Sequence, residues 1–150
     1  MIIDNKSKIY QIIIDTNVMV AALRSSQGAS HRLLKLLKEG DRRFRINVST
    51  ALILEYEAVL KREIHRQGKD VAVIDRFIDD VVSLADRHPI FYLLRTHLKD
   101  ADDDFILELA FSSGTDYIVT YNTGNFRYAK MFGTETLTPK AFLQKIGEIK

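Results

Sequence analysis

The stretch YQIIIDTN, residues 10–17, decides the fold class of this chain, because an apolar run ends there in three polar residues. The run Tyr10–Ile14 is short and rich in β-branched side chains, which is typical of a buried strand. Buried strands of this kind belong to parallel sheets with helices on both faces. Asp15, Thr16 and Asn17 then follow at the carboxyl end of the strand, where open α/β sheets place their binding sites.

Segments with strand and helix patterns alternate from this strand to the end of the chain. We predict further strands over residues 44–48, 90–94, 117–120 and 135–137. We predict helices over residues 18–23, 29–38, 51–64, about 70–85, from the acidic run at 100–104 to 114, and from 138 onward. This alternation predicts a three-layer α/β/α sandwich around a central parallel sheet of about five strands. No composition shift divides residues 1–150, so we expect a single domain.

The composition excludes several classes of protein. Hydrophobic residues make up 46% and charged residues 28% of the 150 residues, which is a normal globular mixture. The chain has no cysteine, so a bound metal would need oxygen or imidazole ligands. Neither a signal peptide nor an apolar run of membrane-spanning length is visible, and we expect a cytoplasmic protein outside the membrane. The net charge of +2 is too small to indicate nucleic-acid binding by itself.

Acidic and amide side chains map to a single edge of the predicted sheet. Asp15 and Asn122 each follow a strand, Glu55 lies in the first turns of a helix after a strand, and residues 100–104 open another helix. The carboxyl ends of parallel strands meet at one edge, so these residues should lie close together. Clustered carboxylates repel one another, and Mg²⁺ or Mn²⁺ would relieve that repulsion. A metal held there can activate water and stabilise charge on a phosphodiester.

Two carboxylates of the helix 51–64 compete for this role. The residues three and four positions from Glu55 are all apolar, so its carboxylate lies at the edge of the core or has a partner. Glu57 has Lys61 four residues further on and so has an ordinary surface ion pair available. This difference favours Glu55.

Asp15 and the acidic run also have simpler explanations. N-capping of the following helix could by itself account for Asp15. The acids at 100–104 could simply interact favourably with the dipole at the start of their helix. Four acids in five positions exceed what a helix end requires. Within the run, Asp103 is three and four residues before Ile106 and Leu107 and therefore leans toward the buried face.

These stretches together resemble PIN domains. The segments IIIDTNV (12–18), VST with LE (48–55), DADDDF with LA (100–110) and YIVTYN with NF (117–126) resemble that family's acidic sites and closing strand, in the family's order. The resemblance covers almost the whole chain. It implies an α/β/α sandwich and Mg²⁺- or Mn²⁺-dependent cleavage of single-stranded RNA, in which metal-bound water attacks the phosphate and leaves a 3′-hydroxyl and a 5′-phosphate.

The resemblance also implies a set of site residues. The metal-binding and catalytic residues would be Asp15, Glu55 and Asp103, with Asp100, Asp104 and Asn122 as further candidate ligands. Thr16, Asn17 and Thr120 would orient these ligands without binding the metal themselves. Many PIN domains have aspartate where this chain has Asn122, which leaves one or two metals open. Asp100, Asp102 or Asp104 could supply the missing charge.

Partners follow from the same resemblance. Many small PIN proteins are toxins restrained by a cognate antitoxin, and they are commonly homodimers. Basic residues near the site would track the RNA backbone, and the candidates are Arg24, Arg42, Arg43 and Lys99. Tyr121 and Phe126 could stack on bases, although core packing is the simpler expectation for both.

Other functions stay open at this point. A catalytically weak PIN-like module could bind RNA or a protein without cleaving it, although the intact acidic triad favours an enzyme. A metal-dependent nuclease acting on DNA is a further alternative. A phosphatase would need a second acid two residues after its nucleophile, and Asn17 occupies that position.

Overall fold

The structure is a computed structural model that describes residues 8–89 and 101–150, with the backbone alone at 101–105. Its centre is a five-stranded sheet in which every neighbouring pair of strands is parallel. In chain order the strands are β1 (Tyr10–Ile14), β2 (Phe44–Val48), β3 (Asp86–Arg87), β4 (Tyr117–Val119) and β5 (Glu135–Leu137). Their order across the sheet is β3-β2-β1-β4-β5, so β1 lies in the middle, next to the switch in strand order.

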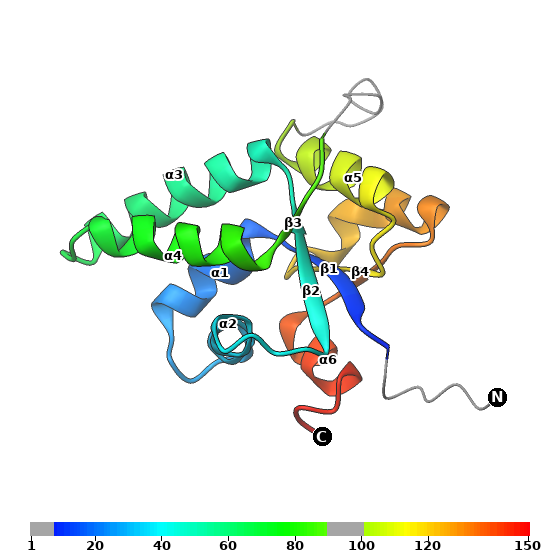
Figure 1. Cartoon of the computed structure of the whole chain (residues 1–150), viewed down its shortest axis with the longest axis horizontal. Helices are drawn as coiled ribbons and strands as arrows, with labels where there is room; N and C mark the ends of the chain where they lie inside the picture. Colours follow the sequence, from blue (N-terminus) through cyan, green and yellow to red (C-terminus); the bar gives the residue numbers. More distant parts are fainter. Residues whose placement is uncertain (1–7, 90–100) are drawn as a thin grey trace.

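Helices cover both faces of this sheet. They are α1 (Thr16–Arg24), α2 (Ala29–Lys38), α3 (Thr50–Arg66), α4 (Ala72–Leu84), α5 (Ala101–Ser113), the 3₁₀ helix η3 (Thr123–Phe132) and α6 (Pro139–Lys145). Figure 1 shows α1, α3 and α4 on one side of the sheet and α5 on the other. The predicted three-layer α/β/α sandwich with a parallel five-stranded sheet is therefore confirmed. Among the described residues, none of the helices combines the length and the apolar character that a membrane span requires.

Local sequence explains where several elements begin. The Ser49 hydroxyl accepts a hydrogen bond from the Leu52 N–H at 3.2 Å and caps α3, the helix that carries Glu55. Thr138 caps α6 in the same way, followed by a proline at the first helical position. These caps set the exit of the chain from β2 and β5 at defined residues.

One strand differs from the sequence-based expectation. The predicted strand at 90–94 lies outside the described residues. The edge strand that pairs with the outer side of β2 is the two-residue β3, which was not predicted. Asp86 and Arg87 are both polar, and Arg45 of β2 donates two hydrogen bonds to the Asp86 carboxylate at 2.9 and 2.7 Å. An edge strand this short buries little apolar surface, so it carries no alternating hydrophobic signal.

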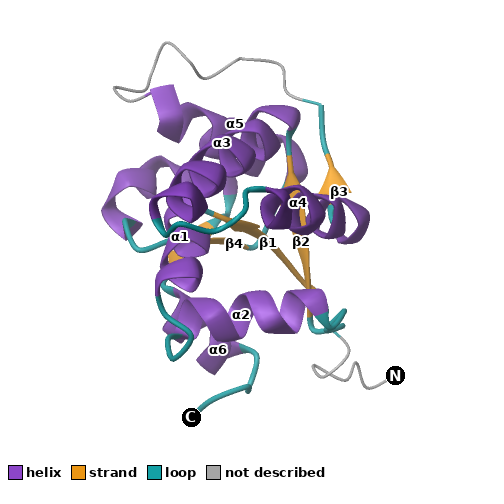
Figure 2. Cartoon of the chain, turned by 90° about the vertical axis from the view of Figure 1, so that its left-hand side faces the viewer, coloured by secondary structure: helices purple, strands orange, loops and turns teal. Residues whose placement is uncertain are grey.

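The amino ends of the central strands are closed by α6. The Phe142 ring is fully buried and lies 6.4, 5.6 and 6.2 Å from the rings of Tyr10, Phe44 and Tyr117, which are the first residues of β1, β2 and β4. Figure 2 shows α6 beside α2 below the sheet. The open edge of the sheet is therefore the opposite one, formed by the carboxyl ends of the strands.

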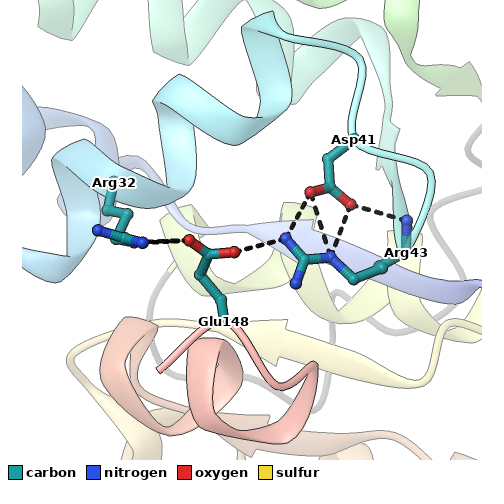
Figure 3. A network of polar contacts seen from close by, with 4 residues as sticks. All are labelled: Arg32, Asp41, Arg43 and Glu148. Carbon is teal, nitrogen blue, oxygen red and sulfur yellow. Dashed lines mark hydrogen bonds and ion pairs between the residues drawn. The ribbon is translucent and has the colours of Figure 1, made fainter. Parts of the chain in front are cut away.

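A polar network secures the segment after α6 to the same closed end (Figure 3). The Glu148 carboxylate accepts hydrogen bonds from Arg32 of α2 and, at 2.7 Å, from Arg43, which also forks onto Asp41. Hydrogen bonds from these arginines hold the pKa values of Asp41 and Glu148 below their ordinary values. The expectation that Arg43 and its neighbour Arg42 track RNA at the acidic edge is wrong, because both precede β2 at the amino end of the sheet.

Candidate active site

Asp15 lies directly after β1, at the carboxyl edge of the sheet. Its backbone N–H donates to the Val119 carbonyl at 2.9 Å, which holds it beside the end of β4. Asp15 occupies the N-cap position of α1, yet its side chain makes no capping hydrogen bond. The carboxylate instead accepts a hydrogen bond from the Thr120 hydroxyl at 2.8 Å. Capping alone therefore does not account for this aspartate.

Glu55 meets Asp15 through the neighbouring threonine. The hydroxyl of buried Thr16 donates to the Glu55 carboxylate at 2.7 Å, across 39 residues of sequence. Asp15 and Glu55 line the same pocket. Lys61 donates to the Glu57 carboxylate at 2.9 Å, so the predicted surface ion pair of Glu57 is confirmed.

Burial raises the pKa of two side chains at this edge. Burial raises the pKa of Asp15 above its ordinary value, although the Thr120 hydrogen bond lowers it. The pKa of fully buried Tyr56 is also raised, by its burial first and then by the negative charges of Asp15 and Glu55. The Tyr56 hydroxyl donates to the Ile14 carbonyl. Negative charge at this position is therefore unfavourable in the protein alone.

Thr120 organises the polar contacts behind Asp15. Its side chain is fully buried, and its hydroxyl accepts from the Asn122 N–H at 3.0 Å and from the Asn17 amide at 3.4 Å. A hydroxyl has one proton and two lone pairs. Because two donors occupy the lone pairs, the proton points to the Asp15 carboxylate. The Asn17 side chain also accepts from the Tyr121 N–H at 3.4 Å, which ties α1 to the loop after β4.

The pocket in front of these residues is open and mixed in character. Besides the two carboxylates, it is lined by the amides of Asn17, Asn122 and Asn125 and by the last turn of α1, including Arg24. Its walls come from α1, α3, the loop after β4 and the first residues of η3. Carboxylate, amide and guanidinium groups thus face one space at the carboxyl edge of the sheet.

A model of the PIN domain family matches residues 11–124 of the chain. This chain belongs to the PIN domain family. The matched range includes Asp15, Glu55, the acidic run at 100–104 and Asn122. PIN domains are typically nucleases and generally use divalent metal ions.

Two solved structures share the PIN fold with this chain. PAE2754 from Pyrobaculum aerophilum is 18% identical, with a TM-score of 0.58 over 95% of this chain and 99% of that chain. VapBC2 from Rickettsia felis, bound to a DNA fragment from their promoter, is 18% identical, with a TM-score of 0.57 over 85% of this chain and 98% of that chain. At this level of identity the likeness shows the fold alone. No curated protein matches the chain.

The third acidic position of this PIN domain is placed only by its backbone. Helix α5 begins at Ala101, so residues 102–104, including Asp103 and Asp104, lie in its first turn. The structure describes only the backbone of these residues. Asp100 lies outside the described residues altogether. No group of three or more His, Cys, Asp or Glu side chains suited to a metal ion occurs in the part of the chain that the structure describes. Metal binding by Asp103 stays a prediction.

The described side chains nevertheless suit a hard divalent cation. Asp15, Glu55 and Asn122 offer the carboxylate and amide oxygens that Mg²⁺ and Mn²⁺ prefer. Burial raises the pKa of Asp15 despite the hydrogen bond from Thr120, so burial disfavours its charged form in the protein alone. A bound cation would compensate for that charge.

The structure separates the remaining sequence-based candidates. Of the proposed RNA-tracking residues, Arg24 lines the pocket, and Lys99 lies outside the described residues. Phe126 is 1% exposed and belongs to the core as expected, whereas Tyr121 is 47% exposed, so the expectation that it packs in the core is wrong. The Tyr121 hydroxyl shares a hydrogen bond with Ser30 of α2.

Glu63, which was not predicted from the sequence, is buried in α3 and forms an ion pair with Arg24 at 2.8 Å. The available signal was its spacing, because Glu63 lies eight residues after Glu55 and so on the same face of α3. Hydrogen bonds from Arg24 lower the pKa of Glu63 to about 2.

We expect Glu63→Gln to destabilise the protein in a pH-dependent manner. A carboxyl whose pKa falls on folding stabilises the native state at pH values above its ordinary pKa of 4.5. This contribution disappears as the pH falls through the folded-state pKa of about 2. Urea denaturation at pH 7, 4 and 2.5 should therefore show a stability difference between wild type and variant that shrinks with acidification. A difference independent of pH would contradict the ion-pair explanation.

Proposed function

We propose that this PIN domain is a Mg²⁺- or Mn²⁺-dependent endoribonuclease that cleaves single-stranded RNA and acts as the toxin of a toxin–antitoxin pair. The observation that supports this most directly is the convergence of Asp15 and Glu55 on one pocket, each with a threonine hydroxyl behind it. These carboxylates come from different elements, and helix α5 carries the third acid, Asp103, in its first turn.

Each residue has a defined part in this proposal. Asp15, Glu55 and Asp103 would hold the metal, with Asp100, Asp104 and Asn122 as further ligands. A bound divalent cation supplies an activated water and stabilises charge on the phosphodiester. Thr120 orients the Asp15 carboxylate, and Thr16 orients that of Glu55. Loss of such a supporting contact commonly lowers metal affinity or activity by roughly 10- to 100-fold.

The toxin assignment draws on the family and on the likeness to VapBC2. It includes a cognate antitoxin, a homodimeric state and a cytoplasmic location. Sedimentation of the purified protein would test the dimer. Co-expression with the product of an adjacent small open reading frame would test for an antitoxin.

The direct test is cleavage of a labelled single-stranded RNA in Mg²⁺, in Mn²⁺ and in EDTA. Single-stranded DNA and duplex RNA of the same sequence serve as matched substrates. Metal-dependent cleavage confined to single-stranded RNA would support the proposal. Equal cleavage of DNA would indicate a less selective nuclease, and RNA binding without cleavage in either metal would favour a binding module.

Metal binding should also be visible as thermal stabilisation. At a metal concentration about ten times Kd, mass action stabilises the folded state by about 1.4 kcal/mol, or about 3–6 °C in Tm for a domain of this size. Protonated Asp15 cannot bind a cation, and its raised pKa means that it takes up a proton at a higher pH than an ordinary aspartate. Differential scanning fluorimetry should therefore show a Tm increase at pH 7.5 that fades on acidification. The same increase in Asp15→Asn would contradict this assignment.

A further inference from the structure

Arg24 is the last residue of α1 and lines the pocket that contains Asp15 and Glu55. Its side chain is 54% exposed. The guanidinium Nε donates to one oxygen of Glu63 at 2.8 Å, and Nη2 donates to the other at 3.1 Å. This two-point contact fixes the plane of the guanidinium as well as its position.

The Glu63 carboxylate is held in place by several partners. Its side chain is 7% exposed, and it also forms an ion pair with Nη2 of Arg66 at 3.2 Å. The Gln67 amide donates to Glu63 at 3.4 Å and to the Leu23 carbonyl at 3.3 Å, which connects the end of α3 to the end of α1. A buried carboxylate with this many partners holds Arg24 in one orientation at the rim of the pocket.

The Arg24 guanidinium has N–H groups beyond those given to Glu63. A guanidinium carries five N–H donors, and the fork onto Glu63 uses two of them. Three donors therefore remain, one on Nη2 and two on Nη1. Two of these can bind a phosphate in the paired geometry that arginine favours.

The charge of the pocket explains why such a group is needed. Asp15 and Glu55 repel the phosphodiester backbone of an RNA entering the pocket to the extent that a bound divalent cation does not neutralise them. Among the described residues that line this pocket, Arg24 is the only lysine or arginine. A positive charge at the rim would offset this repulsion and position the strand.

We propose that Arg24, oriented by Glu63, binds a backbone phosphate of the RNA substrate at the rim of the acidic pocket. This inference rests on the proposed function, because it takes RNA as the ligand. Arg24 acts as a substrate-binding residue, and Glu63 acts through it as a positioning residue.

Arg66 provides a matched control. It pairs with the same carboxylate, yet its side chain is 68% exposed and it does not line the pocket. Replacing either arginine by glutamine removes one positive charge and one partner of Glu63. A difference between Arg24→Gln and Arg66→Gln in RNA binding therefore reports on position at the pocket and not on net charge.

The test measures binding of a labelled single-stranded RNA over a range of salt concentrations, with Ca²⁺ in place of Mg²⁺. We expect Arg24→Gln to weaken binding about tenfold and to reduce the slope of log K against log salt by about 0.7, which is the loss of one phosphate contact. Arg66→Gln should leave both values unchanged. Glu63→Gln should weaken binding less than Arg24→Gln, because the guanidinium remains but is no longer oriented.

Two further measurements separate the possible failures. Arg24→Lys keeps the positive charge, which can still interact with Glu63 and with a phosphate, but loses the paired N–H groups. An intermediate affinity with a wild-type salt slope would therefore support the contact, even if Arg24→Gln is poorly folded. The proposed Arg24–phosphate contact would be overturned if Arg24→Gln kept the wild-type affinity and salt slope. It would also be overturned if Arg24→Gln and Arg66→Gln lost affinity equally, or if the wild-type protein did not bind the RNA. Cleavage in Mn²⁺ is followed in parallel, so loss of the nuclease assignment is seen separately from loss of the Arg24 contact.

Discussion

Asp15→Asn is expected to lower kcat/KM for metal-dependent RNA cleavage by at least about 100-fold, since the metal contributes several kcal/mol to the reaction. Asparagine keeps the shape of the side chain and an oxygen that can accept the Thr120 hydrogen bond. It removes the negative charge that binds a cation. A labelled single-stranded RNA, followed in Mg²⁺ and in Mn²⁺, provides the measurement.

The same substitution should not destabilise the protein without metal. Because burial raises the pKa of Asp15, ionised Asp15 costs stability at pH values above its folded-state pKa, and this cost vanishes below the ordinary value of 3.8. Asp15→Asn should therefore be as stable as wild type or more stable at neutral pH, and the difference should disappear in acid. Thermal unfolding in EDTA at pH 7 and pH 3 would show this.

Glu57→Gln serves as the control for charge loss beside the site. Glu57 is paired with Lys61, and it does not line the pocket. Glu55→Gln should reproduce the loss seen in Asp15→Asn, whereas Glu57→Gln should cleave RNA like wild type. Cleavage that persists in Asp15→Asn would place the active site elsewhere or reveal a contaminating nuclease.

Thr120→Val is expected to reduce kcat/KM by about 10- to 100-fold, although it replaces none of the proposed metal ligands. Valine matches threonine in shape and removes only the hydroxyl. The Asp15 carboxylate then loses its donor at 2.8 Å, and the Asn122 N–H loses its acceptor at 3.0 Å. Both losses fall on the residues that define the pocket.

The pH profile distinguishes this role from a purely structural one. The Thr120 hydrogen bond lowers the pKa of Asp15, so its removal should raise that pKa further and move the acidic limb of the rate profile to higher pH. Thr120→Ser retains the hydroxyl and should restore both the rate and the profile. An unshifted acidic limb in Thr120→Val would show that the hydroxyl does not act on Asp15.

The sequence by itself determined the architecture and the edge of the sheet at which the candidate site lies. The YQIII run and its alternation with helical segments predict a parallel sheet, because apolar patterning is a local property of the chain. Parallel strands bring their carboxyl ends to one edge, so Asp15, Glu55 and Asn122 could be placed together without coordinates. The periodicity of one helix was enough to favour Glu55 over Glu57.

Only the tertiary structure decided how those residues are held. The hydrogen bond from Thr120 to Asp15 spans 105 residues of sequence, and those from Thr16 to Glu55 and from Arg24 to Glu63 each span 39. Contacts of this kind depend on the pairing of β1 with β4 and on the packing of α1 against α3. No local pattern specifies the direction in which a hydroxyl or a guanidinium points. The short polar strand β3 was missed for a related reason, since its partner β2 and not its own sequence makes it a strand.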